Sequence, residues 1–188
     1  PLPVRSSITH KGLIKSYMDK ILIIGYGNVD REDDGVACHI LNKVARQLEL
    51  PEPSQEIEDL DHSQGWPHLL CDLQLDPELA EVIAKYDQVC FVDAHTGAYP
   101  EDIRFEKIAG EFQTSPFTHH MTPQTCLALA ETLYGYAPPG LAVSVRGHQF
   151  GFSNKLSIAT AEFAEVAIEH LMHWLNREGH RPPSKPVD

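Results

Sequence analysis

The chain has 188 residues, of which 42% are hydrophobic and 22% are charged, as in ordinary globular proteins. This composition excludes disordered, collagenous and fibrous chains, and the length favours one compact domain. Acidic residues outnumber basic residues by 27 to 15, which gives a formal net charge of −12. Because such a chain repels phosphate backbones, we expect no nucleic-acid partner, and no apolar run is long enough for a membrane span.

The first predicted strand covers residues 20–24, where the run KILII is apolar at every position after the lysine. Such a short β-branched run is typical of a strand buried on both faces of a parallel sheet. A turn-rich loop, GYGNVDREDDG, follows over residues 25–35. Apolar residues at helical spacing then predict a helix over 35–50, with the acids at 32–34 placed favourably at its N-terminus.

The next part of the chain is less regular. Residues 51–67 are expected to form a loop with a short strand near 56–60, and a second strand is expected over 69–75. An Asp-Pro pair then predicts a helix over 76–85, with Asp76 as its cap.

Five segments from residue 88 onward have strand patterns or helix signals. QVCFV predicts a buried strand over 88–92, and alternating apolar and charged residues predict an edge strand over 103–108. A helix opens at Thr122-Pro123, a strand is expected over 141–145, and an amphipathic helix over 157–176. Strands that alternate with helices predict an α/β sandwich with a mainly parallel sheet.

The termini and the cysteines bear on domain limits and location. Met18 precedes the first strand, so we expect one domain over 18–179, an N-terminal extension or remnant of expression over 1–17, and a flexible tail over 180–188. No secretory signal is evident, which favours a cytoplasmic location. Wide spacing without a Cys-x-x-Cys pair suggests small buried residues in a reducing compartment. The four cysteines are Cys38, Cys71, Cys90 and Cys126.

In a parallel sheet, functional residues collect beyond the carboxyl ends of the strands. Gly25 and Gly27 follow the first strand and suggest a dinucleotide fingerprint, but its third glycine position is Asp30. The neighbouring acids at 32–34 would repel a phosphate, so the glycines are better explained by a tight turn.

A metal site is the other interpretation of these loops. Two carboxylates and an imidazole bind first-row metals such as nickel or zinc. Asp33 or Asp34, Asp93, and His119 or His120 come from three loops expected at one sheet edge. Each also has an ordinary structural explanation, as a helix cap, a turn former or a solvated side chain.

Several motifs together resemble the endopeptidases that mature nickel–iron hydrogenases. They are GYGNVDREDDGVACHIL after the first strand, FVDA at 91–94, THHMTP at 118–123 and LAVSVRG at 141–147. The resemblance implies a three-layer α/β/α sandwich with a twisted sheet of about five strands. It also implies removal of a C-terminal extension from a hydrogenase large-subunit precursor after metal loading.

The resemblance assigns the catalytic and metal-recognition residues as Asp34, Asp93 and His119. Asp34 is the acid directly before Gly35, and His119 fits the family pattern because Met121 is the large apolar residue two positions later. Nickel is then expected to arrive with the precursor, and zinc or cadmium to replace it in crystals. No HExxH motif is present, which argues against a standard zinc-protease mechanism.

The aromatic loop after the strand at 141–145 departs from the family pattern. We expect His148, Phe150 and Phe152 to contact the precursor, together with residues 62–67, although a hydrophobic cluster that closes the sheet end would look the same. The expected partner is the precursor alone, bound by a monomer. A non-enzymatic nickel-binding chaperone and a small nucleotide-binding domain remain the alternatives.

Overall fold

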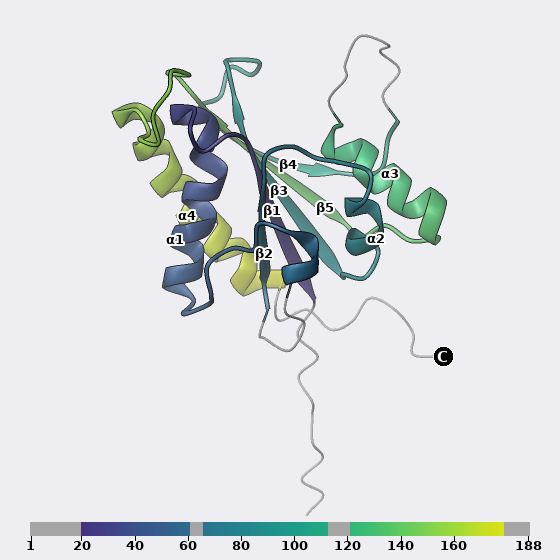
Figure 1. Ribbon diagram of the computed structural model, residues 1–188. Coiled ribbons are helices and arrows are strands. Elements are labelled where there is room, and N and C mark those ends of the chain that lie inside the picture. Colours follow the sequence, from purple (N-terminus) through teal and green to yellow (C-terminus); the bar gives the residue numbers. More distant parts are fainter. Residues whose placement is uncertain (1–19, 61–65, 113–120, 179–188) are drawn as a thin grey trace, which may run out of the picture.

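The computed structural model describes residues 20–60, 66–112 and 121–178 (Figure 1). In these ranges, five strands form one sheet. Their bounds are β1, Ile21–Tyr26; β2, His68–Asp72; β3, Gln88–His95; β4, Ile103–Ile108; and β5, Gly140–Arg146. The order is β2-β1-β3-β5-β4, and all pairs are parallel except the edge strand β4, which is antiparallel to β5. The predicted α/β fold with a mostly parallel sheet is therefore confirmed.

Helices cover both faces of this sheet. In the described ranges they are α1, Val36–Gln47; α2, Leu79–Ile83; α3, Pro123–Tyr134; and α4, Ile158–Glu178. α1 and α4 pack on one face, and α2 and α3 pack on the other (Figure 1). This arrangement confirms the expected three-layer sandwich. None of these described helices combines the length and the apolar character that a membrane crossing requires.

β1 is apolar without interruption because it lies inside the sandwich. Ile21 and Ile23 join the core beneath α1 and α4, whereas Leu22 and Ile24 join the core beneath α2 and α3. All four side chains are at most 2% exposed. Since successive side chains point to opposite faces, a central strand with both faces covered has to be apolar at each position.

The start of α3 is as expected, whereas the start of α2 is not. The Thr122 hydroxyl accepts a hydrogen bond from the Thr125 N–H at 3.2 Å, and Pro123 is the first helical residue. Asp76 accepts a hydrogen bond from the N–H of Glu78 at 2.9 Å, but α2 begins only at Leu79, after Glu78, and has no side-chain cap. The predicted cap Asp76 and the predicted helix limits 76–85 are therefore wrong, and the Asp76–Glu78 hydrogen bond belongs to the turn before α2.

Two further expected elements differ in the structure. The strand near 56–60 is wrong, because Ile57–Asp59 forms a 3-10 turn in a segment with one apolar residue among acids. β3 continues past 92 to His95, since Ala94 and His95 still pair with β5. Asp93 therefore lies within a strand rather than after it. The limits expected for residues 1–17 and 180–188 lie outside the described residues.

Candidate functional site

The loop after β1 folds back onto the acidic 3-10 helix Glu32–Gly35. Gly27 has φ 134°, and a Cβ there would lie 2.2 Å from the carbonyl oxygen of Asp34. A Cβ on Gly35 would lie 2.8 Å from the Cα of Val29. These contacts require glycine and account for the motif without any bound phosphate.

Asp33 is fully buried and serves as a structural anchor. Its carboxylate accepts hydrogen bonds of 2.7–2.9 Å from backbone N–H groups and hydroxyls of His148, Gln149, Ser157 and Thr160. Burial raises its pKa, but these hydrogen bonds outweigh that effect and hold the pKa below its usual range. The Asp33 carboxylate thus ties the acidic turn to the loop after β5 and to the start of α4.

Asp34 is placed differently from its neighbour. Its carboxylate is half-buried and accepts a hydrogen bond from the N–H of Asn28 at 3.0 Å. The negative charge of Asp34 also acts on Asp93, whose pKa it raises. Of the two acids that the sequence left open, Asp34 is the one that lies close enough to interact with Asp93 while its carboxylate remains incompletely enclosed.

Asp93 is the buried carboxylate of this edge. Burial raises its pKa to about 7 and the Asp34 charge adds to the rise, while hydrogen bonds from the Tyr26 hydroxyl and the Ala94 N–H oppose it. Burial also holds the pKa of Tyr26 well above its ordinary value, so its hydroxyl remains a donor. At neutral pH, Asp93 is therefore poised between its charged and neutral forms.

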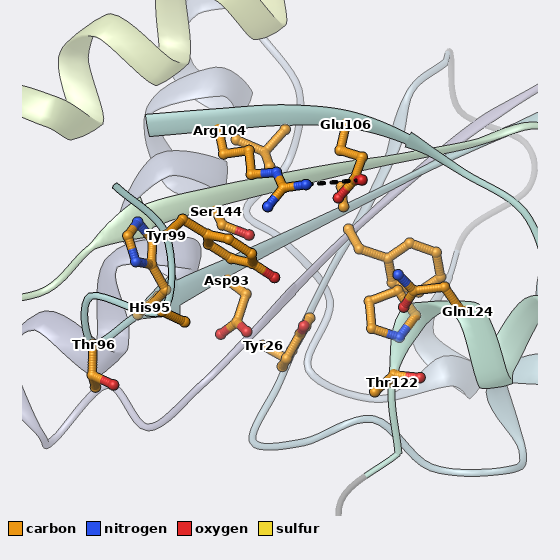
Figure 2. A pocket seen from close by; sticks show the side chains of 16 residues that line it. Tyr26, Asp93, His95, Thr96, Tyr99, Arg104, Glu106, Thr122, Gln124 and Ser144 are labelled. Atoms are coloured by element: carbon orange, nitrogen blue, oxygen red, sulfur yellow. Dashed lines mark ion pairs between the residues drawn. The ribbon is translucent and has the colours of Figure 1, made fainter. Parts of the chain in front are cut away.

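A pocket of about 450 Å³ opens over Asp93 (Figure 2). Ser144 of β5 pairs with Asp93, and Arg104 of β4 pairs with Ser144, so one polar row crosses three strands. Arg104 forms an ion pair with Glu106 at 2.9 Å and lies 4.2 Å above the ring centre of Tyr99. The pocket thus places charged and polar groups around Asp93, whose pKa is about 7.

Sequence reasoning missed Tyr26 and the β4 pair as part of this site. Tyr26 and Asp93 lie on the same sheet face because Ile24 is in register with Phe91 on the neighbouring strand. Alternation along each strand gives the face, but only the register shows that the two side chains meet. His95 also lines the pocket, and burial lowers its pKa.

His119 and His120 lie outside the described residues. Thr122 and Gln124, which follow His119 closely in the sequence, line the pocket. Within the described ranges, no group of three or more His, Cys, Asp or Glu side chains is arranged to hold a metal ion. The structure thus brings Asp34 and Asp93 together and leaves their predicted third partner untested.

In the aromatic loop after β5, the ring of Phe152 is exposed and the ring of Phe150 is half-buried. Phe152 is 91% exposed, with the Arg31 guanidinium 5.6 Å from its ring centre. Phe150 is half-buried, and its ring packs so closely on Gly147 that a Cβ there would lie 2.6 Å from it. The exposed His148 has its ring 5.9 Å from that of Phe163. Phe152 is therefore the exposed phenylalanine of this loop.

Trp66, at the described end of the segment 62–67, does not flank the pocket as expected. Residues 61–65 lie outside the described residues, but Trp66 is described and packs on His68, with ring centres 4.1 Å apart. His68 is the first residue of β2 and pairs with Leu22 near the start of β1. Because both parallel strands start there, Trp66 lies at the amino edge of the sheet, opposite the pocket.

No protein-family model and no curated protein matches the chain. Solved structures match its fold. The nickel–iron hydrogenase maturation protease HycI from Thermococcus kodakarensis is 18% identical, with a TM-score of 0.60 over 86% of this chain and 95% of that chain. The hydrogenase maturating endopeptidase HybD from E. coli is 19% identical, with a TM-score of 0.55 over 85% and 94% of the two chains. The chain therefore has the fold of solved hydrogenase maturation proteases.

Proposed function

We propose that the protein is an endopeptidase that removes the C-terminal extension of a nickel–iron hydrogenase large-subunit precursor after metal loading. One observation carries the proposal: Asp34 and Asp93 interact at the carboxyl edge of the sheet, beside a pocket of about 450 Å³. The shared fold of solved maturation proteases supports the same conclusion. His119, which precedes α3 in the sequence, is the proposed third contact to the metal.

The paired acids suit a cation that comes with the substrate. The Asp34 charge disfavours the charged form of Asp93, and a divalent cation between the two carboxylates would reverse that effect. Such a cation favours the charged form of Asp93, so nickel in a loaded precursor would displace the proton that Asp93 holds near neutral pH. Zinc and cadmium, which accept the same ligands, are expected to occupy the position in soaked crystals.

Metal content would then decide which precursor is processed. A loaded precursor gains contacts with Asp34, Asp93 and His119 that a metal-free precursor lacks, so the site discriminates by differential binding. We propose metal recognition as the role of Asp93, and its raised pKa describes the free enzyme before the metal arrives.

The remaining features of the proposal concern the partner and the setting. The exposed ring of Phe152 offers a hydrophobic contact to the precursor near the acidic turn. His148 and Phe150 of the same loop would position it. We propose that the enzyme acts as a cytoplasmic monomer, with the precursor as its partner and without nucleic acid or membrane.

The proposal is tested by incubating the purified protein with nickel-loaded and metal-free precursor and measuring intact mass over time. We expect the loaded precursor to shorten and the metal-free precursor to stay intact. Asp93→Asn keeps the shape of the side chain and removes its charge, so it should fold and leave the loaded precursor uncut. Binding of loaded precursor by the wild-type protein without shortening would instead favour the nickel-binding chaperone.

A further inference from the structure

Two of the four cysteines contact each other beneath the acidic turn. Cys38 lies in α1 and Cys71 in β2, and their thiols share a hydrogen bond. The other two, Cys90 and Cys126, are fully buried and have no cysteine partner among the described residues. The widely spaced thiols of Cys38 and Cys71 are therefore brought together by the fold, a contact that sequence spacing alone does not reveal.

Both thiols are also accessible from a second cavity, separate from the pocket over Asp93. The exposed fractions are 6% for Cys38 and 9% for Cys71, and both residues line a cavity of about 600 Å³. Surface loops at 27–30 and 52–55 form the other walls. A space of this size admits molecules as small as water or hydrogen peroxide, since a water molecule occupies about 30 Å³ in the liquid.

We propose that Cys38 and Cys71 are a redox-active dithiol that closes to an intramolecular disulfide when a peroxide enters this cavity. The thiolate of one cysteine attacks the O–O bond, which gives a sulfenic acid and releases hydroxide. The sulfur of the second thiol then displaces the sulfenic hydroxyl, which leaves as water. In total, two thiols and one hydrogen peroxide become one disulfide and two water molecules.

The hydrogen bond between the thiols gives them different roles. Donation from Cys71 lowers the pKa of Cys38, whereas the same bond and burial raise the pKa of Cys71. Cys38 therefore supplies the attacking thiolate, and Cys71 resolves the sulfenic acid. Reactive cysteines combine a stabilised thiolate with a path for the oxidant, and Cys38 has a lowered pKa and lines the cavity.

The bond would join parts of the chain that hold the acidic turn in place. Cys71 is in register with Gly25 of β1, and the next residue, Asp72, accepts a hydrogen bond from the Gly27 N–H at 3.1 Å. Cys38 lies one turn of helix after Asp34. Oxidation would cross-link the two supports of the loop that positions Asp34, whatever reaction the protein catalyses.

The test uses the full-length reduced protein, a small molar excess of hydrogen peroxide, and intact mass with non-reducing peptide mapping. We expect the loss of two hydrogen atoms, reversed by dithiothreitol, and a single linked peptide pair that contains Cys38 and Cys71. The mass loss should disappear in Cys38→Ala and Cys71→Ala and persist in the control Cys126→Ala.

The map of the wild-type protein keeps the proposal testable even if a variant does not fold. Oxygen additions without a link, a link to Cys90 or Cys126, a covalent dimer or an unchanged mass would each overturn it. None of these measurements depends on peptidase activity, so the proposed function and the dithiol can fail separately.

Discussion

Asp33 and Asp34 are adjacent acids with opposite expected roles. N–H and hydroxyl donors surround the Asp33 carboxylate. Asp33→Asn replaces one of its acceptor oxygens with an NH₂ group, which is a donor. We expect it to lower the free energy of unfolding by about 2–4 kcal/mol, because buried donors lose a charged partner. Urea unfolding measures this change.

The matched control is Asp34→Asn, whose half-buried carboxylate accepts one backbone hydrogen bond. It should change the free energy of unfolding by less than about 1 kcal/mol and yet abolish processing of loaded precursor. A stable, active Asp33→Asn variant beside an unstable Asp34→Asn variant would show that the two roles are exchanged.

The raised pKa of Asp93 predicts an unusual pH dependence of stability. The folded protein keeps a proton on Asp93 up to a pH of about 7, whereas the unfolded chain loses it near its ordinary pKa of about 4. The folded state thus binds more protons in this range, and the free energy of unfolding falls as pH rises from 4 to 7.

Asp93→Asn removes this titration, so the wild-type protein should lose stability relative to the variant across the same range. Urea unfolding of both proteins at pH 4.5, 6 and 7.5 measures the difference. A constant difference would mean that Asp93 titrates normally in the folded protein.

Of the adjacent residues His119 and His120, we expect only His119 to contact the metal. His119→Ala removes the proposed nitrogen ligand and should leave loaded precursor uncut, while His120→Ala should retain most activity. Intact mass of the precursor and circular dichroism of both variants separate lost chemistry from lost folding. An inactive His120→Ala variant with an active His119→Ala variant would move the predicted ligand by one residue.

At the scale of the elements, apolar patterning predicted where strands and helices lie better than where they meet. The uninterrupted run of β1 and the alternation of β4 gave a central and an edge strand, because burial on two faces or one leaves a direct pattern. The extension of β3 to His95 depends on pairing with β5, which no local pattern carries.

The candidate site likewise combines residues that a local pattern predicts with residues that only the fold brings together. The rule that loops gather at the carboxyl edge placed Asp33 or Asp34 near Asp93 without any knowledge of strand order, and the family resemblance chose Asp34. Tyr26 and Arg104 join the pocket through register across the sheet, which depends on the whole fold. The expected position of Trp66 was wrong because this residue precedes β2, and the amino end of a parallel strand lies at the opposite edge.

The loop after β5 contains one exposed phenylalanine, Phe152, and one half-buried phenylalanine, Phe150. Phe152→Ala should raise the KM for precursor by about fivefold or more, since an exposed aromatic residue beside a site often anchors a partner. Its melting temperature should stay unchanged, because the ring contacts little beyond Arg31. Steady-state processing kinetics and thermal melting measure the two effects.

Phe150→Ala is the comparison within the same loop. Its ring packs on Gly147, so its loss should lower the melting temperature. If Phe152→Ala leaves KM unchanged, the precursor does not use this ring.

At the scale of the whole molecule, the sheet and its two covering layers account for the buried core. Each buried hydrophobic residue of the described chain lies between Ile21 and Leu175. The two cores share the sheet as a common layer, so unfolding one face exposes the other. Such a structure should unfold in one cooperative step.

A chain limited to residues 18–179 therefore contains every described residue of both cores. We expect it to unfold in a single transition, with a melting temperature within about 2 °C of the full chain, because termini outside a core add little stability. Differential scanning calorimetry of the two chains, combined with processing of loaded precursor, measures fold and activity together. A shortened chain that melts much earlier would mean that residues 1–17 or 180–188 pack on the sandwich, and the expected domain limits would be wrong.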